Sequence, residues 1–321
     1  MKRPSIAGLA CLVVVCMCTT FAHAQSITKI RVGNFSNIFV LPLFNGIEKG
    51  DFKEADLDVE IIPYQTGPGV VSAVAGGEVD VAWSAAIPPI LARSRGIPVK
   101  IFMNVAAESQ PDHLTQWIVA TAKSGISSMK DIKGKTVIIN ANGGGCELAL
   151  RDRLSAEGLD WNDIKRVVVP FPQMQAALEL GNADAVCTID PFYTSIMHSK
   201  DIGAKVIAAG VFSKTPVPLV SNNFFALETW LKANREAAIR FGKAYEKSKK
   251  DLETDSDRRV ALAVKYLGLA PDLAAKVDLS SWRDTPVVTL EAVKSTIDAM
   301  LKGGLLKTPM AAEQVVEILP Y

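Results

Sequence analysis

The chain has 321 residues, of which 49% are hydrophobic and 21% are charged, and this length suits two domains of ordinary size. Its 35 basic and 34 acidic residues leave a formal net charge of +1. A balance this even argues against nucleic acid or an anionic membrane as the partner.

The first residues have the pattern of a secretory signal peptide. Lys2 and Arg3 precede an apolar run from Ile6 to Met17, and Ala22-His23-Ala24 places small residues where a signal peptidase cleaves. The apolar run is too short to compete as a membrane span, which needs about 20 residues. We therefore expect residues 1–24 to be removed and the mature chain to be exported to the periplasm.

Removal of this segment leaves two of the five cysteines, Cys146 and Cys187. In an oxidising compartment the two could form a disulfide. Both fall inside predicted regular elements of the same lobe, where packing could hold them apart. The sequence leaves their pairing open.

Short apolar runs bounded by turn residues alternate with helical periodicity along the chain, which is typical of βαβ units and a parallel sheet. Near-continuous hydrophobicity in the first runs predicts strands that are covered on both faces. The first strands are predicted at 30–35, 57–63, 79–83 and 99–105. The polar stretch 107–115 contains Pro111 and is predicted to cross to a second lobe.

The second lobe is predicted to follow the same pattern, with strands at 117–121, 135–140, 166–169, 185–189 and 204–208. Residues 210–218 then form a return crossover, and 220–226 re-enter the first lobe as a strand. The helical residues from Glu228 on are expected to pack on the first lobe, with the last helices reaching toward the second. Lobe I would thus comprise 25–110 with 218–321, and lobe II 111–217.

The two lobes repeat one phrase, strand–helix–strand–helix–strand, about 105 residues apart. The first copy runs from Ile30 to Ser84 and the second from Thr136 to Thr188. Two similar α/β lobes leave a cleft between them, so a binding protein is the leading hypothesis.

Several segments of the second lobe resemble the periplasmic substrate-binding proteins of ABC importers, in the branch for taurine, aliphatic sulfonates, nitrate and thiamine-pyrimidine precursors. They are Ser127-Ser128-Met129-Lys130-Asp131-Ile132-Lys133-Gly134-Lys135, Gly158-Leu159, Ala177-Leu178, Gly181-Asn182-Ala183-Asp184-Ala185 and Asp190-Pro191-Phe192. The resemblance implies an α/β fold of two doubly wound lobes joined by two crossover strands, as in type II periplasmic binding proteins. It also implies a monomer without a cofactor that closes on one small solute and delivers it to a permease in the inner membrane.

In doubly wound sheets, ligands bind beyond the carboxyl ends of the strands. The strongest candidate there is the loop Asn142-Gly143-Gly144-Gly145, which follows strand 135–140 and precedes a helix. Its glycines let the backbone approach a ligand closely, and free N–H groups at a helix N-terminus favour an anion. The alternative is a plain tight turn; no Gly-Lys-Ser/Thr follows, so the loop is not a Walker loop.

Asp190 ends strand 185–189 and is the second candidate. Its counterparts in the resembled family are often glutamate, which in amine-binding members can receive an ammonium group. Capping of the next helix is an equal alternative. Phe192 is expected either to line the pocket or to pack beneath it.

The strand ends of the first lobe supply hydroxyl groups for a polar head and aromatic faces for a planar or apolar body. The candidate residues there are Asn34, Phe35, Ser36, Thr66, Gly67, Trp83 and Ser84. None of the candidate strand ends in either lobe carries an arginine, which weakens the case for multiply charged anions.

One residue would support a catalytic function, because a thiol such as Cys146 at a helix N-terminus can be nucleophilic. A pyrimidine-synthesising branch of the same superfold exists, but Gly143-Gly144-Gly145 stand where that branch would need cysteines. His113 and His198 are spaced neither as a metal site nor as a triad. We therefore expect no enzyme and no metal.

The sequence predicts an exported protein that captures a small organic anion or zwitterion, of the sulfonate or carboxylate type, for an ABC importer. A ligand sensor or scavenger with the same fold, and a pyrimidine-precursor binding protein or enzyme, are the alternatives.

Overall fold

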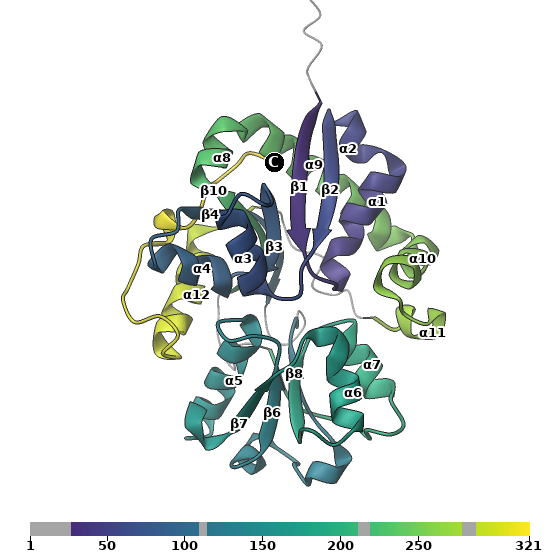
Figure 1. Ribbon diagram of the computed structural model, residues 1–321, viewed down its shortest axis with the longest axis vertical. Helices are drawn as coiled ribbons and strands as arrows, with labels where there is room; N and C mark the ends of the chain where they lie inside the picture. The colour runs from purple at the N-terminus through teal and green to yellow at the C-terminus, as the bar shows by residue number, and fades with distance from the viewer. Residues whose placement is uncertain (1–26, 109–113, 211–218, 278–286) are drawn as a thin grey trace, which may run out of the picture.

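The computed structural model describes residues 27–108, 114–210, 219–277 and 287–321, and in these parts the chain forms two lobes (Figure 1). The predicted signal peptide, its cleavage point and the lobe boundaries at 110/111 and 217/218 lie outside the described residues. In the described parts of the chain no helix is both long and apolar enough to span a membrane.

Lobe I is built on a five-stranded sheet in the order β2-β1-β3-β10-β4. Its strands are β1 (Thr28–Asn34), β2 (Leu57–Pro63), β3 (Val81–Ala85), β4 (Val99–Glu108) and β10 (Leu219–Leu227). β1 runs parallel to β2 and β3, whereas β10 runs antiparallel to β3 and β4. The sheet is therefore mixed rather than wholly parallel, because β10 comes back from the other lobe.

Lobe II repeats this arrangement in the order β7-β6-β8-β5-β9. Its strands are β5 (Trp117–Ala120), β6 (Thr136–Ile139), β7 (Lys165–Val168), β8 (Ala185–Thr188) and β9 (Lys205–Ala209). β5, which enters from lobe I, is antiparallel to both of its neighbours. All ten predicted strands are present, and β1-β2-β3 correspond to β6-β7-β8 as the repeat predicts.

One strand begins later than its apolar pattern indicates. The run predicted at 79–83 becomes β3 at 81–85, and Asp80, just before the strand, is bound by Arg31 in the middle of β1. Its Oδ2 accepts from the backbone N–H of Arg31 at 2.8 Å, and its Oδ1 pairs with the Arg31 guanidinium at 2.8 Å. The ion pair fixes the entry to β3 against β1.

Helices cover both faces of each sheet. The lobe I helices are α1 (Leu41–Lys49), α2 (Asp51–Glu54), α3 (Gly67–Ala75), α4 (Ile87–Ser94), α8 (Glu228–Ala233), α9 (Arg235–Thr254), α10 (Ser256–Leu267), α11 (Pro271–Ala274) and α12 (Leu290–Lys302). The lobe II helices are α5 (Gly145–Ala156), α6 (Met174–Glu179) and α7 (Phe192–His198). Short 3-10 turns lie at Ile38–Val40, Ala122–Ser124, Met129–Ile132, Trp161–Asp163, Phe171–Gln173 and Ala312–Gln314.

The C-terminal helices pack on lobe I, as predicted: α9 lies against α1 and α2, and α12 lies against β10 and α4. The end of α12 also reaches lobe II, where Arg151 Nη1 of α5 donates to the Gly303 carbonyl at 3.3 Å. Leu148 of α5 is buried in the apolar cluster formed with α12 and α4. The two lobes are therefore in contact through α5 as well as through the crossing strands.

Candidate ligand-binding site

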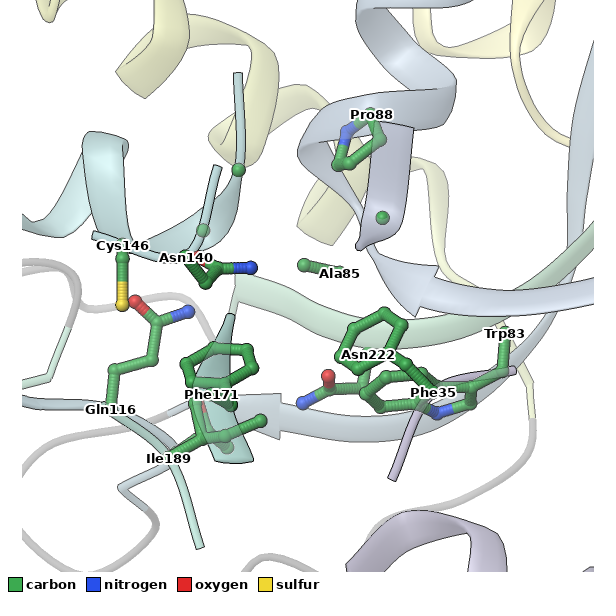
Figure 2. A pocket seen from close by; sticks show the side chains of 14 residues that line it. Phe35, Trp83, Ala85, Pro88, Gln116, Asn140, Cys146, Phe171, Ile189 and Asn222 are labelled. Carbon is green, nitrogen blue, oxygen red and sulfur yellow. The ribbon is translucent and has the colours of Figure 1, made fainter. Parts of the chain in front are cut away.

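A small cavity of about 30 Å³ lies between the lobes, at the carboxyl ends of the strands (Figure 2). Both lobes contribute to its lining, which consists of Phe35, Gly67, Trp83, Ala85, Pro88, Thr115, Gln116, Asn140, Gly144, Gly145, Cys146, Phe171, Ile189 and Asn222. This is the position at which doubly wound sheets bind their ligands. None of these lining side chains carries a formal charge.

Three buried polar atoms in the lining have no hydrogen-bond partner: Trp83 Nε1, Gln116 Oε1 and Asn140 Oδ1. Leaving such a group buried and unsatisfied costs about 1–3 kcal/mol. The indole is a donor only, while either amide presents a donor if its oxygen and nitrogen exchange places. All three residues line the cavity, which places polar groups without partners in its wall.

The N-terminus of α5 opens on the same cavity. Its N-cap, Gly144, is extended and provides no side-chain cap for the first turn. A Cβ on Gly145 would collide with the Gln116 amide nitrogen, and a Cβ on Gly144 would lie 3.4 Å from Asn140 Oδ1. Gly143 has a φ of +72°, which favours glycine. The glycines thus allow the helix N-terminus to sit directly against the amides of the cavity.

Aromatic rings form a continuous wall across the two lobes. Phe35 meets Trp83 edge-to-face at 4.8 Å in lobe I, and Phe171 stacks on Phe192 at 5.6 Å in lobe II. Between the lobes, Phe35 and Phe171 stack with centroids 6.2 Å apart. The wall gives the cavity one apolar side beside its polar helix N-terminus.

Cys146 and Cys187 form a disulfide, with their Cα atoms 5.6 Å apart. Packing therefore does not hold them apart. Cys146 lies in the first turn of α5, and Cys187 lies on β8, which pairs with β6, the strand that leads to α5. Because Cys146 is bound in this disulfide, it has no free thiol that could act as a nucleophile.

Five of the thirteen predicted site residues line the cavity: Phe35, Gly67, Trp83, Gly144 and Gly145. Two others, Asn142 and Gly143, line a larger neighbouring cavity of about 510 Å³ between α3, α4, α5 and the end of α12. Phe192 is only indirectly involved, behind Phe171.

The other five candidates are used elsewhere. Asp190 precedes Pro191, the N-cap of α7, and its Oδ1 accepts from the Thr194 N–H at 3.1 Å and from the Thr194 hydroxyl at 2.7 Å in the first turn of that helix. Thr66 caps α3 by accepting from the Gly69 N–H at 3.2 Å, and the Ser84 hydroxyl donates to the Ala85 carbonyl at 2.7 Å.

Asn34 and Ser36 are also absent from the cavity lining. Asn34 is buried at the end of β1, where its carbonyl accepts from the Tyr64 N–H at 2.6 Å. Ser36 is exposed to solvent. Adjacent positions at the end of one strand point in different directions, so only Phe35 of this trio reaches the cavity.

Sequence reasoning missed the amide residues Gln116, Asn140 and Asn222, and also Phe171. Asn140 and Phe171 stand at the carboxyl ends of β6 and β7, so the strand-end rule could have found them. Gln116 and Asn222 belong to the segments that cross between the lobes, where neighbouring polar residues gave no signal of which one faces the cleft.

Among the described residues no group of three or more His, Cys, Asp or Glu side chains could hold a metal ion. His198 contacts the Thr194 carbonyl through Nδ1 at 2.8 Å, outside the cavity. His113 lies outside the described residues.

Solved structures share this architecture. The alkanesulfonate-binding protein SsuA from Xanthomonas axonopodis pv. citri, bound to MOPS, has a TM-score of 0.78 at 19% identity and covers 92% of this chain and 100% of that one. The periplasmic nitrate-binding protein NrtA from Synechocystis PCC 6803 has a TM-score of 0.76 at 14% identity, with coverage of 91% and 86%. Two mixed sheets with a cleft between them thus define the fold as that of a periplasmic binding protein.

The family model described as NMT1/THI5 like matches residues 37–257, which is more than half of the chain. An aliphatic sulfonates-binding protein of Escherichia coli (strain K12) is 25% identical over 287 residues, covering 88% of this chain and 84% of that protein. The chain belongs to the NMT1/THI5-like family. The relatives named above are described as binding proteins, for aliphatic sulfonates, alkanesulfonate and nitrate.

Proposed function

We propose that this protein is exported to the periplasm, captures a small singly charged organic anion of the sulfonate or carboxylate type, and presents it to an ABC permease in the inner membrane. The observation that carries the proposal is the polar side of the cavity. There, the buried amides of Gln116 and Asn140, whose oxygens have no partner, lie directly against the uncapped N-terminus of α5.

The chemistry of this arrangement fits one negative charge. Backbone N–H groups and the positive end of the helix dipole favour an anion, and the indole of Trp83 adds a donor. Among the described residues that line the cavity there is no arginine or lysine, so none of them would offset the desolvation of a second charge. The names of the relatives, which refer to aliphatic sulfonates, alkanesulfonate and nitrate, support the same class of ligand.

Capture would work by closure of the lobes. The Phe35–Phe171 stack, together with the contact of α5 with α12, joins the lobes when the cleft is shut. A ligand held by groups from both lobes stabilises that closed state.

The test is a thermal-shift and titration screen of the mature chain after refolding, which removes any ligand that co-purifies. Taurine, alkanesulfonates, nitrate and aromatic carboxylates form the panel. A true ligand at a hundredfold excess over its Kd stabilises the protein by about 2.7 kcal/mol. Binding of none of these compounds by a folded protein would contradict the proposal.

The variant Trp83→Phe keeps the aromatic wall and removes only the indole donor. We expect it to weaken anion binding about tenfold, as the loss of one hydrogen bond to a charged group does. Trp230→Phe, at a half-buried position on α8 away from the cleft, is the matched control and should bind like the parent protein.

A further inference from the structure

One arginine of α5 is bonded to both lobes. Arg151 donates from Nε to Glu147 Oε1 at 2.8 Å, one turn earlier on the same helix, and from Nη1 to the Gly303 carbonyl at 3.3 Å. Gly303 is the C-cap of α12 in lobe I. The last carbonyls of a helix have no partner within it and carry the negative end of its dipole, so a guanidinium is favourable there. An arginine of lobe II thus caps a helix of lobe I.

The end of α12 is shaped for this contact. It closes with Gly303 and Gly304, and Gly304 has a φ of +70°, which favours glycine. A Cβ on Gly303 would lie 3.2 Å from Leu148 Cδ1, closer than side chains normally approach. On its other side, the Arg151 guanidinium carbon lies 4.4 Å from the centre of the Trp161 ring. Arg151 is therefore held between the end of α12 and an aromatic face of its own lobe.

Glu147 extends this contact to the glycine loop. Its Oε2 accepts from the Gly143 N–H at 2.8 Å, while its Oε1 lies 2.7 Å from Arg151 Nη2. Only 7% of the Glu147 side chain is exposed, and a carboxyl group this buried keeps its place through its partners. Arg151 therefore determines where Glu147 lies. Glu147 in turn holds Gly143, which directly precedes the two glycines that line the ligand cavity.

We propose that Arg151 is a positioning residue for the solute: it caps α12 of lobe I and, through Glu147, fixes the glycine loop of lobe II in the conformation that meets the solute. The inference rests on the proposed capture of an anion at this loop and adds a residue outside the ligand cavity on which affinity depends. A coupling free energy between two sites is reciprocal. A solute at the loop therefore also strengthens the bond between Arg151 and the end of α12.

The variant Arg151→Met removes the guanidinium and keeps a long side chain. The probe is whichever of taurine, ethanesulfonate and benzoate binds the refolded parent protein most tightly, and its dissociation rate is measured by stopped-flow tryptophan fluorescence. We expect the rate to rise about tenfold, within the roughly two- to thirtyfold range over which residues that couple two sites act. The matched control is Arg153→Met on the same helix, because the Arg153 guanidinium donates to the Ala209 carbonyl within lobe II. It should keep the parent rate.

A double-mutant cycle tests whether the effect passes through Glu147. The cycle compares Glu147→Gln, Arg151→Met and the variant that carries both changes. If the two residues act in one chain of contacts, the double variant releases the probe no faster than the faster of the single variants. Multiplied rate increases in the double variant would overturn the chain. A parent-like rate in Arg151→Met, or an equal rise in Arg153→Met, would overturn the role of Arg151.

Hydrogen exchange gives a readout that a merely structural role would not move. In Arg151→Met the Gly143 amide should exchange several-fold faster than in the parent, while the Leu150 amide in the middle of α5 keeps its rate. Equal acceleration at both amides would mean that the variant only loosens the helix, and would overturn the proposal.

The parent protein provides a test that does not depend on a variant that folds. Arg151 is not among the residues that line the ligand cavity. Saturation with the probe should nevertheless slow hydrogen exchange at Arg151 Nε, and an unchanged rate would overturn the coupling while anion capture stands. If none of the three probes binds a parent protein that shows a cooperative melt, anion capture itself fails and the inference fails with it.

Discussion

The hydrogen on Gly145 faces the Gln116 side chain, whose amide end would have to move aside for any larger residue at this position. A Cβ there would collide with the Gln116 amide and would lie 3.5 Å from the Ala85 Cβ. Both neighbours line the ligand cavity, and Ala85 belongs to the opposite lobe. A single methyl group at this position would therefore displace the Gln116 amide within the cavity, while its contact with Ala85 would be an ordinary one.

We expect Gly145→Ala to weaken anion binding by more than tenfold, because the helix N-terminus and Gln116 can no longer approach the same ligand. Isothermal titration with the best ligand of the screen measures the change. Gly76→Ala is the control, since a Cβ at the end of α3 would meet the Ser72 and Ala73 carbonyls at ordinary distances of 3.4 and 3.9 Å. Normal binding by Gly145→Ala would show that the helix N-terminus is not part of the site.

The glycine loop could be predicted from sequence, whereas its partners could not. Three consecutive glycines between a strand and a helix indicate a close approach to something. Asn140 and Gln116 complete the site, but β5, which Gln116 precedes, is antiparallel in its sheet, so the strand-end rule for parallel strands does not apply to it. Asp190 allowed two roles from sequence, because a carboxylate at a strand end can contact a ligand or cap the next helix, and its bond with Thr194 four residues later is visible only in three dimensions.

Secondary-structure elements join in two places that decide how rigid the cleft is. The first is the disulfide between the start of α5 and β8, which closes a loop of 41 residues in sequence separation. The chain-entropy account gives a loop of this size roughly 4 kcal/mol of stabilisation. The bond also holds the N-terminus of α5 in its place beside β8.

Reduction of this disulfide, or the double variant Cys146→Ser with Cys187→Ser, should lower the free energy of unfolding by about 2–4 kcal/mol. Urea unfolding with and without a reductant measures the loss. The double variant also serves as the control for the reductant, which should have no further effect on it. An unchanged midpoint of unfolding on reduction would contradict the assignment.

The second junction is the contact of α5 with α12. Two leucines of α5 distinguish the contact of this helix with α12 from its packing in the core of lobe II. Leu148 is buried in the cluster shared with α12, whereas Leu150 is buried in the core of lobe II. Leu150→Ala should destabilise the fold by about 2–5 kcal/mol. Leu148→Ala should mainly weaken ligand binding, because its contact helps to hold the lobes closed.

The two variants are compared by thermal melts without ligand and by titration with ligand. For Leu148→Ala we expect the larger loss of affinity, and for Leu150→Ala the larger loss of stability. Equal losses of affinity in the two variants would mean that the α5–α12 contact does not favour closure.

A different junction, which is not one of the two at the cleft, links α1 to α10, and its strength depends on pH. The Glu48 carboxylate accepts from Lys265 at 2.7 Å and Tyr266 at 2.6 Å, and pairs with Arg258 at 2.6 Å. Hydrogen bonds from Lys265 and Tyr266, with the charge of Arg258, lower the pKa of Glu48 from 4.5 to about 2. A lowered pKa in the folded state means that this stabilisation is present above pH 4.5 and is lost as the pH falls toward 2.

Glu48→Gln should therefore flatten the acid limb of the stability curve, by on the order of 1 kcal/mol for a network near the surface. Melting temperatures measured from neutral pH down to the acid limit give the curve. The control is Glu60→Gln, which breaks an exposed pair with Lys29. An acid limb in Glu48→Gln that parallels the parent curve would show that the network adds nothing.

The whole molecule is one design used twice, and this was visible in the sequence. The apolar runs predicted all ten strands, and the repeat predicted two similar lobes, whose sheets have equivalent strand orders in the structure. The direction of β5 and β10 was not predictable from local patterns, because the apolar pattern of a buried strand is the same whether the strand is parallel or antiparallel to its neighbours. That direction follows from the path of the chain between the lobes, which is a property of the entire fold.

The neutral lining of the cavity has a consequence for the conditions under which the protein works. When a ligand is held by dipoles rather than by lysine or arginine, its capture displaces few bound counterions. Affinity should therefore change only slightly when the ionic strength rises roughly tenfold, because the partners are buried groups that mobile ions screen poorly. Titration in several salts would measure this, and a steep loss of affinity would point to a cationic contact. Such a protein would keep its affinity for the ligand in a compartment whose salt content follows that of the cell's surroundings.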